Sequence, residues 1–306
     1  MTAFGFATVM ADESPPQLAV TVGRRLVPLQ DALPAGRAPG CVPDDLLGLL
    51  DRWEEWVAAV ETALARDCAG HLPWRNESDV RFLPPATHRP TIYCAGANYR
   101  DHVAEMGATP PDPAVERPFH FVIPPAALTG HRCHAPRPAG MQRLDWEVEL
   151  TAVIGRTADR VSVDKALEYV AGYTVANDLS CRDDAALDTP LFGINWLLQK
   201  GWRGLKPLGP AIVPASLVPH PENLDIRLSV NGQVRQKSNT SQMIFSLAEQ
   251  ISALSTLAPL HPGDLLLSGT PAGTAAAHQN RYLVPGDLVV AEVEGVGRLE
   301  TRISAG

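Results

Sequence analysis

The sequence predicts a β-rich α+β fold, with a small N-terminal α+β module and linker over residues 1–89 and a larger domain over 90–306. Three observations support this prediction. The 28 prolines and 24 glycines indicate many turns between short elements. Runs of β-branched and apolar residues recur along most of the chain. Helical spacing of apolar residues is clear in only a few segments. At 306 residues and 45% apolar content, the chain can form a substantial core.

The N-terminal module is expected to contain three strands and one helix. The strands are predicted at residues 4–9, 18–22 and 26–28. Asp44 or Asp45 is a suitable N-cap for the helix, because Asp accepts hydrogen bonds from the first backbone N–H groups. The apolar side chains that follow recur at helical spacing, namely Leu46, Leu49, Leu50, Trp53, Val57, Val60 and Leu64. The proline-bearing stretch 68–89 is interpreted as the linker.

The larger domain is expected to be mostly strands. Asn98 as N-cap and Gly107 after the last turn predict a short helix. Asn231-Gly232 is a strong hairpin signal. A brief helix is predicted at 164–170 and a clear amphipathic helix at 243–257. Strands are predicted at 91–95, 118–123, 145–155, 172–180, 211–213, 224–230, 264–270, 288–293 and 297–303.

Composition excludes several classes of protein. The net charge of −8, without any run of Lys or Arg, argues against nucleic acid or a membrane surface as the main partner. No apolar run approaches the roughly 18 residues that span a bilayer, and the start lacks a secretory pattern. The five scattered cysteines, Cys41, Cys68, Cys94, Cys133 and Cys181, argue against a disulfide framework or a zinc–thiolate site. We therefore expect a cytoplasmic protein.

Two glutamates in the predicted strand around 145–150 attract attention. Because side chains alternate along a strand, Glu147 and Glu149 project to the same face. Adjacent carboxylates repel each other, so they need bulk water or a cation. One interpretation is an amphipathic strand with a solvated acidic face, and the other is a cation site. Asp178, which follows the apolar residues Val175 and Ala176, also requires a cation or several donors.

Other residues could complete a site. On the predicted helix after Asn98, His102 and Glu105 are three residues apart, so they share one face. A carboxylate beside an imidazole orients it and raises its basicity, which suits a general base. Such pairs are also common on exposed helices. The turn at Pro271-Ala272-Gly273 could bring backbone N–H groups against an anion. Lys200 by itself is most simply an exposed loop lysine.

Together and in this order, these segments resemble the fumarylacetoacetate hydrolase family over about residues 91–303. The motifs that carry the resemblance are Gly96-Ala97-Asn98-Tyr99 with His102 and Glu105, residues 145–150, 172–178 with Arg182-Asp183, Lys200-Gly201, 207–210, 230–232, 243–246, 262–264 and 268–273. The resemblance implies a mixed β-sandwich roll around the active site, usually in a homodimer. Residues 1–89 resemble only the variable N-terminal module of longer members.

The resemblance also implies a Mg²⁺ ion, replaceable by Mn²⁺ or Ca²⁺, held by Glu147, Glu149 and Asp178. Three carboxylates without a thiol or imidazole describe a site for a hard cation. Asp145 has no ligand role in the family pattern. The implied catalytic residues are His102, Glu105 and Lys200. The implied substrate-binding residues are Asn98, Tyr99, Arg182, Thr270, Pro271, Ala272 and Gly273.

The family's chemistry implies hydrolysis of a 2,4-dioxo acid, an acylpyruvate or fumarylpyruvate. His102, oriented by Glu105, would take a proton from the water that attacks C4. The C3–C4 bond would break, and the metal and Lys200 would stabilise the resulting pyruvate enolate. An alternative is a decarboxylase, an isomerase or tautomerase, or a hydratase or lyase, acting on a 2-oxo acid at the same metal site. A third possibility is a repurposed accessory protein of a biosynthetic pathway.

The sequence departs from the family pattern at three places. Members commonly have a basic residue where Ala97 stands, a Lys where Ile123 stands, and an Asp-Thr-Phe segment where this chain has Arg203-Gly204-Leu205. These departures leave the metal site intact but bear on the substrate and on hydrolysis itself. Arg203 or Lys206 could supply replacement positive charge.

Overall fold

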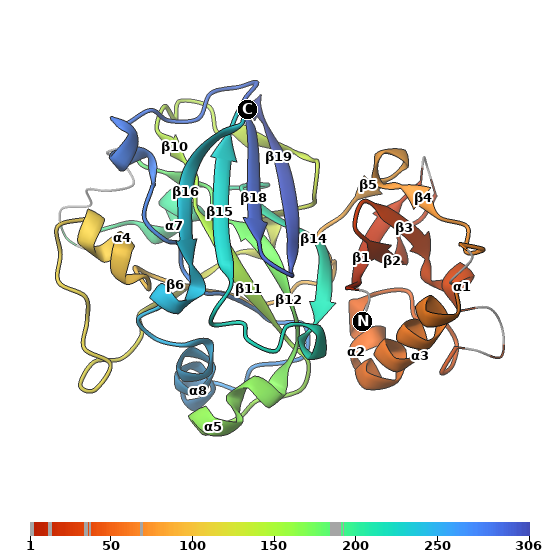
Figure 1. The fold of residues 1–306 in the computed structure, drawn as a ribbon. Coiled ribbons are helices and arrows are strands. Elements are labelled where there is room, and N and C mark those ends of the chain that lie inside the picture. Colours follow the sequence, from red (N-terminus) through yellow and green to blue (C-terminus); the bar gives the residue numbers. More distant parts are fainter. Residues whose placement is uncertain are drawn as a thin grey trace.

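The computed structural model describes residues 3–11, 14–33, 36, 38–67, 70–183, 191 and 193–306. Within these residues the fold is mixed α+β and rich in strands, as predicted (Figure 1). The N-terminal module, coloured red to orange, lies beside the larger body that holds the C-terminus. Four cysteines in the described residues are free thiols, and Cys68 lies outside those residues. No helix in the described part of the chain is long and apolar enough to cross a membrane.

The largest sheet in the described residues has 12 strands. Its main order is β4-β3-β2-β1-β14-β12-β11-β17-β6-β7, with β5 paired to β1 and β8 paired to β14. The N-terminal strands join the larger body where Phe6 of β1 pairs with Ile212 of β14. The strands are β1 Gly5–Met10, β2 Gln17–Val22, β3 Arg25–Pro28, β4 Arg75–Asn76, β5 Arg81–Phe82, β6 Ile92–Ala95, β7 His120–Ile123, β8 Leu128–Thr129, β11 Val148–Ile154, β12 Val170–Asn177, β14 Lys206–Pro214 and β17 Leu265–Leu267.

A second sheet packs against the centre of the first. Its order is β16-β15-β18-β19-β9, and its strands are β9 His134–Arg137, β15 Asp225–Val230, β16 Gln233–Asn239, β18 Leu288–Val293 and β19 Gly297–Ala305. One apolar cluster contains Leu150 of β11, Val175 of β12, Leu228 of β15 and Ala291 of β18, so the two sheets enclose a common core. The predicted hairpin is present, and both Asn231 (φ 51°) and Gly232 (φ 79°) have the positive φ that this turn requires.

The helices are shorter than predicted. In the N-terminal module, the expected single helix is divided into α2 Leu46–Leu50 and α3 Trp53–Arg66, because residues 51–52 form a turn. Asp45 caps α2 by accepting the N–H of Gly48. The other helices are α1 Leu29–Ala32, α4 Arg100–Glu105, α5 Val163–Ala166, α7 Trp196–Lys200 and α8 Leu247–Leu257.

Helix α8 begins at Leu247 rather than at the predicted Met243. Ser246 accepts a hydrogen bond from the N–H of Glu249, and the Glu249 side chain accepts one from the N–H of Ser246. This capping box satisfies backbone donors at the start of the helix and fixes where it begins. Figure 1 shows α8 and α5 next to each other at one end of the sheets.

Candidate metal centre and active site

The acidic segment 145–150 is not one continuous strand, which corrects the prediction from alternation. Strand β10, Leu144–Asp145, pairs with β13, Ser180–Cys181, and β11 begins only at Val148. Between them the backbone N–H of Glu147 donates to Asn177 Oδ1 over 3.0 Å, and the carbonyl of Glu147 accepts the N–H of Asp178 over 2.8 Å. The break therefore holds Glu147 directly beside the end of β12 and Asp178.

Glu147, Glu149 and Asp178 form one buried cluster. Each offers a carboxylate oxygen, and these oxygens lie within 4.8 Å of one another. All three residues are at most 4% exposed, so the alternative of a solvated acidic face is wrong. Oxygens bound to one Mg²⁺, Mn²⁺ or Ca²⁺ ion can be at most about 5 Å apart, since each lies about 2.0–2.6 Å from the ion. The oxygen spacing thus fits a hard divalent cation.

Three cationic side chains surround the cluster. Lys200 Nζ lies 2.6 Å from Glu147 Oε2 and 2.5 Å from Asp178 Oδ2. Lys206 Nζ lies 2.8 Å from Asp178 Oδ1. Arg182 pairs with Glu147 and, over 3.2 Å, with Asp145 Oδ2. With Asp145 there are four carboxylates against three cations, so a bound divalent cation would change the formal charge of the centre from −1 to +1.

Asp145 is part of this arrangement through its contact with Arg182. It is 2% exposed and accepts the N–H groups of Trp146 (2.8 Å) and Ala275 (2.9 Å) in addition to the contact with Arg182. Its position outside the acidic cluster agrees with the absence of a ligand role. Asp145 therefore orients Arg182 toward Glu147.

Electrostatics distinguish the members of the cluster. Burial opposes ionisation of Asp178, but Lys200 and Lys206 outweigh it and lower the pKa of the Asp178 carboxyl to about 2. Burial and the charge of Asp178 raise the pKa of Glu149 well above its ordinary value. No Lys or Arg of the described residues lies within ion-pair distance of Glu149, which accepts only the N–H of Gly269, over 2.7 Å. Glu149 is the carboxylate that a bound cation would stabilise most.

The loop after β17 is held on both sides by hydrogen bonds. The Gly269 N–H binds Glu149, and the Gly273 N–H donates to Glu105 Oε2 over 2.6 Å. Gln236 of β16 was not singled out in the sequence, yet it is fully buried and binds this loop. Its Nε2 donates to Pro271 O and Thr270 Oγ1, both over 2.8 Å, and its Oε1 accepts the Val148 N–H over 3.0 Å. Its place on a hairpin strand gave no sequence signal for this role.

His102 and Glu105 lie together on α4, as their spacing predicts. His102 Nδ1 is 3.4 Å from Glu105 Oε1, and their side chains are 12% and 18% exposed. Thr274 Oγ1 also donates to Glu105 Oε1, over 3.1 Å. Burial raises the pKa of Glu105, but the hydrogen bonds from His102, Gly273 and Thr274 outweigh it and hold that pKa below its ordinary value. Glu105 is therefore a fixed anion beside the imidazole of His102.

The predicted substrate-binding residues are placed in different ways. Asn98 does not cap α4, whose N-cap is Tyr99, and this corrects the capping prediction. Its Nδ2 donates to Phe245 O (3.0 Å) and Ser268 O (2.8 Å), and its Oδ1 accepts the Phe245 N–H (2.9 Å). Tyr99 is completely buried. Asn98 thus joins the start of α4 to Phe245 and Ser268, and Tyr99 forms an isolated antiparallel bridge with Met243.

In the loop, the Thr270 hydroxyl donates to Val148 O over 2.9 Å, and Pro271 is buried. Ala272 and Gly273 are half-buried. The Ala272 N–H lies 3.4 Å from Asp101 Oδ1. Arg182, with a side chain 21% exposed, borders the cluster.

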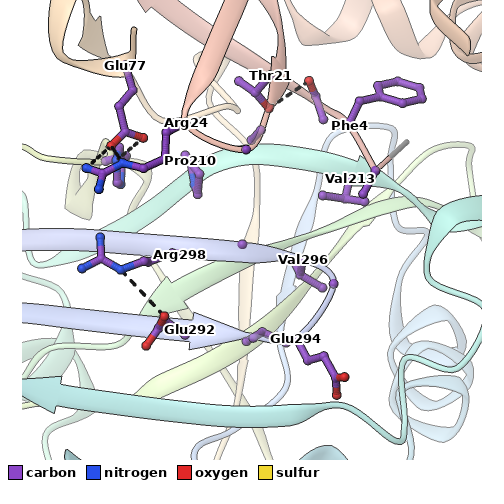
Figure 2. Close-up of a pocket in the computed structure, with 18 residues that line it drawn as sticks. Phe4, Thr21, Arg24, Glu77, Pro210, Val213, Glu292, Glu294, Val296 and Arg298 are labelled. Atoms are coloured by element: carbon purple, nitrogen blue, oxygen red, sulfur yellow. Dashed lines mark hydrogen bonds and ion pairs between the residues drawn. The ribbon is translucent and has the colours of Figure 1, made fainter. Parts of the chain in front are cut away.

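A separate cleft lies between the N-terminal module and the larger body. Its volume is about 460 Å³, and Figure 2 shows Phe4, Thr21 and Arg24 on one side and Glu292, Val296 and Arg298 on the other. None of the predicted site residues lines it. Its size would admit a small ligand. The chemistry predicted from the sequence, however, is concentrated at the acidic cluster.

Comparison with known proteins decides the family. The sequence model of the fumarylacetoacetate (FAA) hydrolase C-terminal domain matches residues 91–304. The chain belongs to the fumarylacetoacetate hydrolase family. A bovine (Bos taurus) member named oxaloacetate tautomerase FAHD2A, mitochondrial, is 36% identical over 263 residues, which cover 86% of this chain and 80% of that protein.

Two further members of the fumarylacetoacetate hydrolase family differ in reaction. The 4-hydroxyphenylacetate degradation bifunctional isomerase/decarboxylase of Salmonella dublin is 41% identical over 229 residues, covering 75% of this chain and 49% of that protein. The crystal structure of fumarylpyruvate hydrolase from Pseudomonas aeruginosa, in complex with Mn²⁺ and pyruvate, is 33% identical. It has a TM-score of 0.64 and covers 74% of this chain and 92% of that one. The family of enzymes and its fold are thus established, and these members catalyse different reactions.

The structure also shows what stands at the departures from the family pattern. Ile123 is 1% exposed and packs in an apolar cluster with Ile92 and Leu265. Arg203 is exposed and contributes no charge to the cluster. Lys206 is 1% exposed and does contribute one. Of the two replacement cations considered from the sequence, only Lys206 lies at the acidic residues.

Proposed function

We propose that this protein is a Mg²⁺-dependent hydrolase that cleaves the C3–C4 bond of a 2,4-dioxo acid of the acylpyruvate or fumarylpyruvate type. One observation carries the proposal: a single loop, 269–274, binds both the acidic cluster through Glu149 and the His102–Glu105 pair through Glu105. A cation site for the keto acid and a base for water are therefore built on one rigid support. The fumarylpyruvate hydrolase relative, solved with Mn²⁺ and pyruvate, supports this assignment.

Each residue has a role in the proposed reaction. Glu147, Glu149 and Asp178 would hold the cation, which when bound supplies Lewis-acid stabilisation of developing enolate charge. His102 takes a proton from water, Glu105 stabilises the imidazolium, and the hydroxide adds to C4. The C3–C4 bond then breaks with its electron pair on C3, which takes up a proton to give pyruvate, while C4 leaves as a carboxylic acid. Lys200 offers positive charge to the enolate oxygen.

A second candidate is tautomerisation of a 2-oxo acid, with a decarboxylase, isomerase, hydratase or lyase as variants of the same enolate chemistry. It is favoured by the oxaloacetate tautomerase relative, which matches most of both chains. Proton transfer by His102 would suffice for tautomerisation, and no water would attack carbon. A repurposed accessory protein is disfavoured, because the acidic cluster, the His102–Glu105 pair and the contact of Lys200 with Glu147 are all present.

An ultraviolet assay of acylpyruvates, fumarylpyruvate and oxaloacetate with Mg²⁺ separates the two reactions. We expect the parent protein to hydrolyse a member of the acylpyruvate group, and His102→Ala to lose hydrolysis by about 10²–10⁴-fold. The control is His134→Ala, because His134 is exposed on β9. Hydrolysis at the parental rate by His102→Ala would refute the role in water activation. Oxaloacetate turnover without any acylpyruvate hydrolysis would favour the tautomerase.

The identity of the ion and the assembly are further proposals. We propose Mg²⁺ as the ion, with Mn²⁺ or Ca²⁺ as substitutes, because an all-carboxylate set suits hard cations. We also propose a cytoplasmic homodimer that binds a small 2-oxo acid and neither nucleic acid nor membrane. Activity after chelation and return of single ions tests the first proposal, and light scattering of the purified protein tests the dimer.

A further inference from the structure

We propose that Lys206 is a positioning residue, which fixes Asp178 with one oxygen turned toward the cation site and does not itself contact substrate. The inference rests on the proposed metal-dependent function. It assigns separate tasks to the two buried lysines that contact Asp178 from opposite oxygens, Lys206 at Oδ1 and Lys200 at Oδ2.

The ammonium group of Lys206 is enclosed by oxygen atoms of the protein. Its side chain is 1% exposed. Its Nζ donates to Leu179 O over 2.6 Å and to Leu205 O over 3.3 Å. It also forms an ion pair with Asp178 Oδ1 over 2.8 Å. Lys206 is therefore buried against these three oxygens and is not exposed to a substrate.

Lys200 differs in this respect. Its Nζ has two carboxylate contacts, Glu147 Oε2 and Asp178 Oδ2, and it lies 5.6 Å from the ring centroid of Phe121. One of its three N–H donors has no acceptor among the described residues. Lys200 is thus the lysine that can direct a hydrogen bond at a bound keto acid.

The backbone around Lys206 makes it a rigid support. Lys206 begins strand β14 and pairs with Leu128 of β8. Its ammonium group binds both the side chain of Asp178 and the carbonyl of the next residue, Leu179, so it fixes the direction in which Asp178 leaves β12. A partner that orients a metal ligand in this way commonly changes metal affinity about 10–100-fold when it is removed.

Removing Lys206 would have two opposing effects on cation binding. Loss of a positive charge reduces repulsion of the incoming ion, which favours binding. Loss of the contact leaves Asp178 Oδ1 buried without its partner, since Asp178 is 1% exposed and no other described Lys or Arg pairs with that oxygen. Breaking one side of a buried ion pair is strongly unfavourable, so we expect the second effect to dominate.

The test is Mg²⁺ and Mn²⁺ calorimetry on the full chain, comparing the parent with Lys206→Met and with the matched variant Lys200→Met. Circular dichroism first establishes that each variant is folded at the working temperature. We expect Lys206→Met to bind Mg²⁺ about 10–100-fold more weakly. Lys200→Met should keep or gain Mg²⁺ affinity and lose turnover. Should Lys206→Met fail to fold, Lys206→Gln, which keeps a polar side chain, is measured instead and should show the same weakening.

Parental Mg²⁺ affinity in a folded Lys206 variant would overturn the proposal. A raised KM with unchanged metal affinity would also overturn it, because Lys206 would then contact substrate. Calorimetry needs no substrate, so a parent that binds Mg²⁺ without hydrolysing any acylpyruvate would refute only the proposed function. A parent that binds neither ion would refute both.

Discussion

Gly273 donates its backbone N–H to Glu105 over 2.6 Å, so the loop after β17 is tied directly to helix α4. At its other end the same loop binds Glu149 through the Gly269 N–H, over 2.7 Å. The His102–Glu105 pair on α4 and the acidic cluster are far apart in sequence, and residues 269–273 of the loop connect them. Changes to either end of this loop are therefore expected to affect both halves of the site.

The first prediction concerns Glu105 and pH. Because hydrogen bonds from His102, Gly273 and Thr274 lower the pKa of Glu105 in the folded protein, its ionised form stabilises the fold. This contribution is fully present above the unfolded pKa of about 4.3 and is lost as the pH falls through the lower folded pKa. The unfolding free energy of the parent should thus fall more steeply below about pH 4.3 than that of Glu105→Gln.

Urea denaturation between pH 7 and pH 3 measures this difference. Glu168→Gln is the control, because Glu168 is 53% exposed and contacts only the exposed side chains of Arg156 and Lys165. Parallel curves for the parent and Glu105→Gln would show that Glu105 is not held as an anion.

The second prediction concerns the acidic cluster. Glu147→Ala, Glu149→Ala and Asp178→Ala each remove one of three buried carboxylates, so we expect each variant to lose measurable Mg²⁺ binding and activity. A ligand that binds only the folded state raises its stability, so added Mg²⁺ should raise the unfolding midpoint of the parent and not of the variants. Calorimetry and thermal unfolding with and without EDTA test this. Unchanged Mg²⁺ affinity in any of the three would contradict the assignment of that residue.

The third prediction concerns Gln236. Gln236→Leu leaves the buried Val148 N–H and Pro271 carbonyl without a partner, which should cost about 1–3 kcal/mol of unfolding free energy. Gln233→Leu on the same strand should change it by less than about 0.5 kcal/mol, because Gln233 is exposed. Urea denaturation at pH 7 compares the two. Equal stability of both variants would mean that Gln236 does not hold the loop.

Much of the local structure could be predicted from sequence because its causes are local. The Asn231-Gly232 hairpin and the strands on either side of Gly295 follow from turn chemistry and short apolar runs. The predictions that were wrong concern where elements begin or break. Helix α8 begins at its capping box rather than at Met243, and α2 and α3 are separated by a turn. Apolar spacing alone does not encode these boundaries.

For the candidate site too, the motifs could be recognised in the sequence, whereas the contacts between distant residues could not. The order of its motifs was sufficient to indicate the family and to select Glu147, Glu149 and Asp178, which the structure brings within 4.8 Å of one another. Alternation placed Glu147 in a strand, whereas a hydrogen bond from its backbone to Asn177 breaks the strand there. Asn98 was predicted to cap α4, but Tyr99 is the N-cap, and the Asn98 amide holds Phe245 and Ser268, 147 and 170 residues away.

The sequence by itself determined the family, the residue types of an oxygen-ligand cation site and most of the strands, because these depend on short-range patterns. Only the tertiary structure decided that Lys206 and Gln236 belong to the site and that Arg203 does not. The positions of Lys206 and Gln236 depend on contacts between distant residues, such as Lys206 with Leu179 and Gln236 with Val148, which are 27 and 88 residues apart. A buried lysine and an exposed one have the same appearance in sequence, and the difference arises only when packing removes one of them from water.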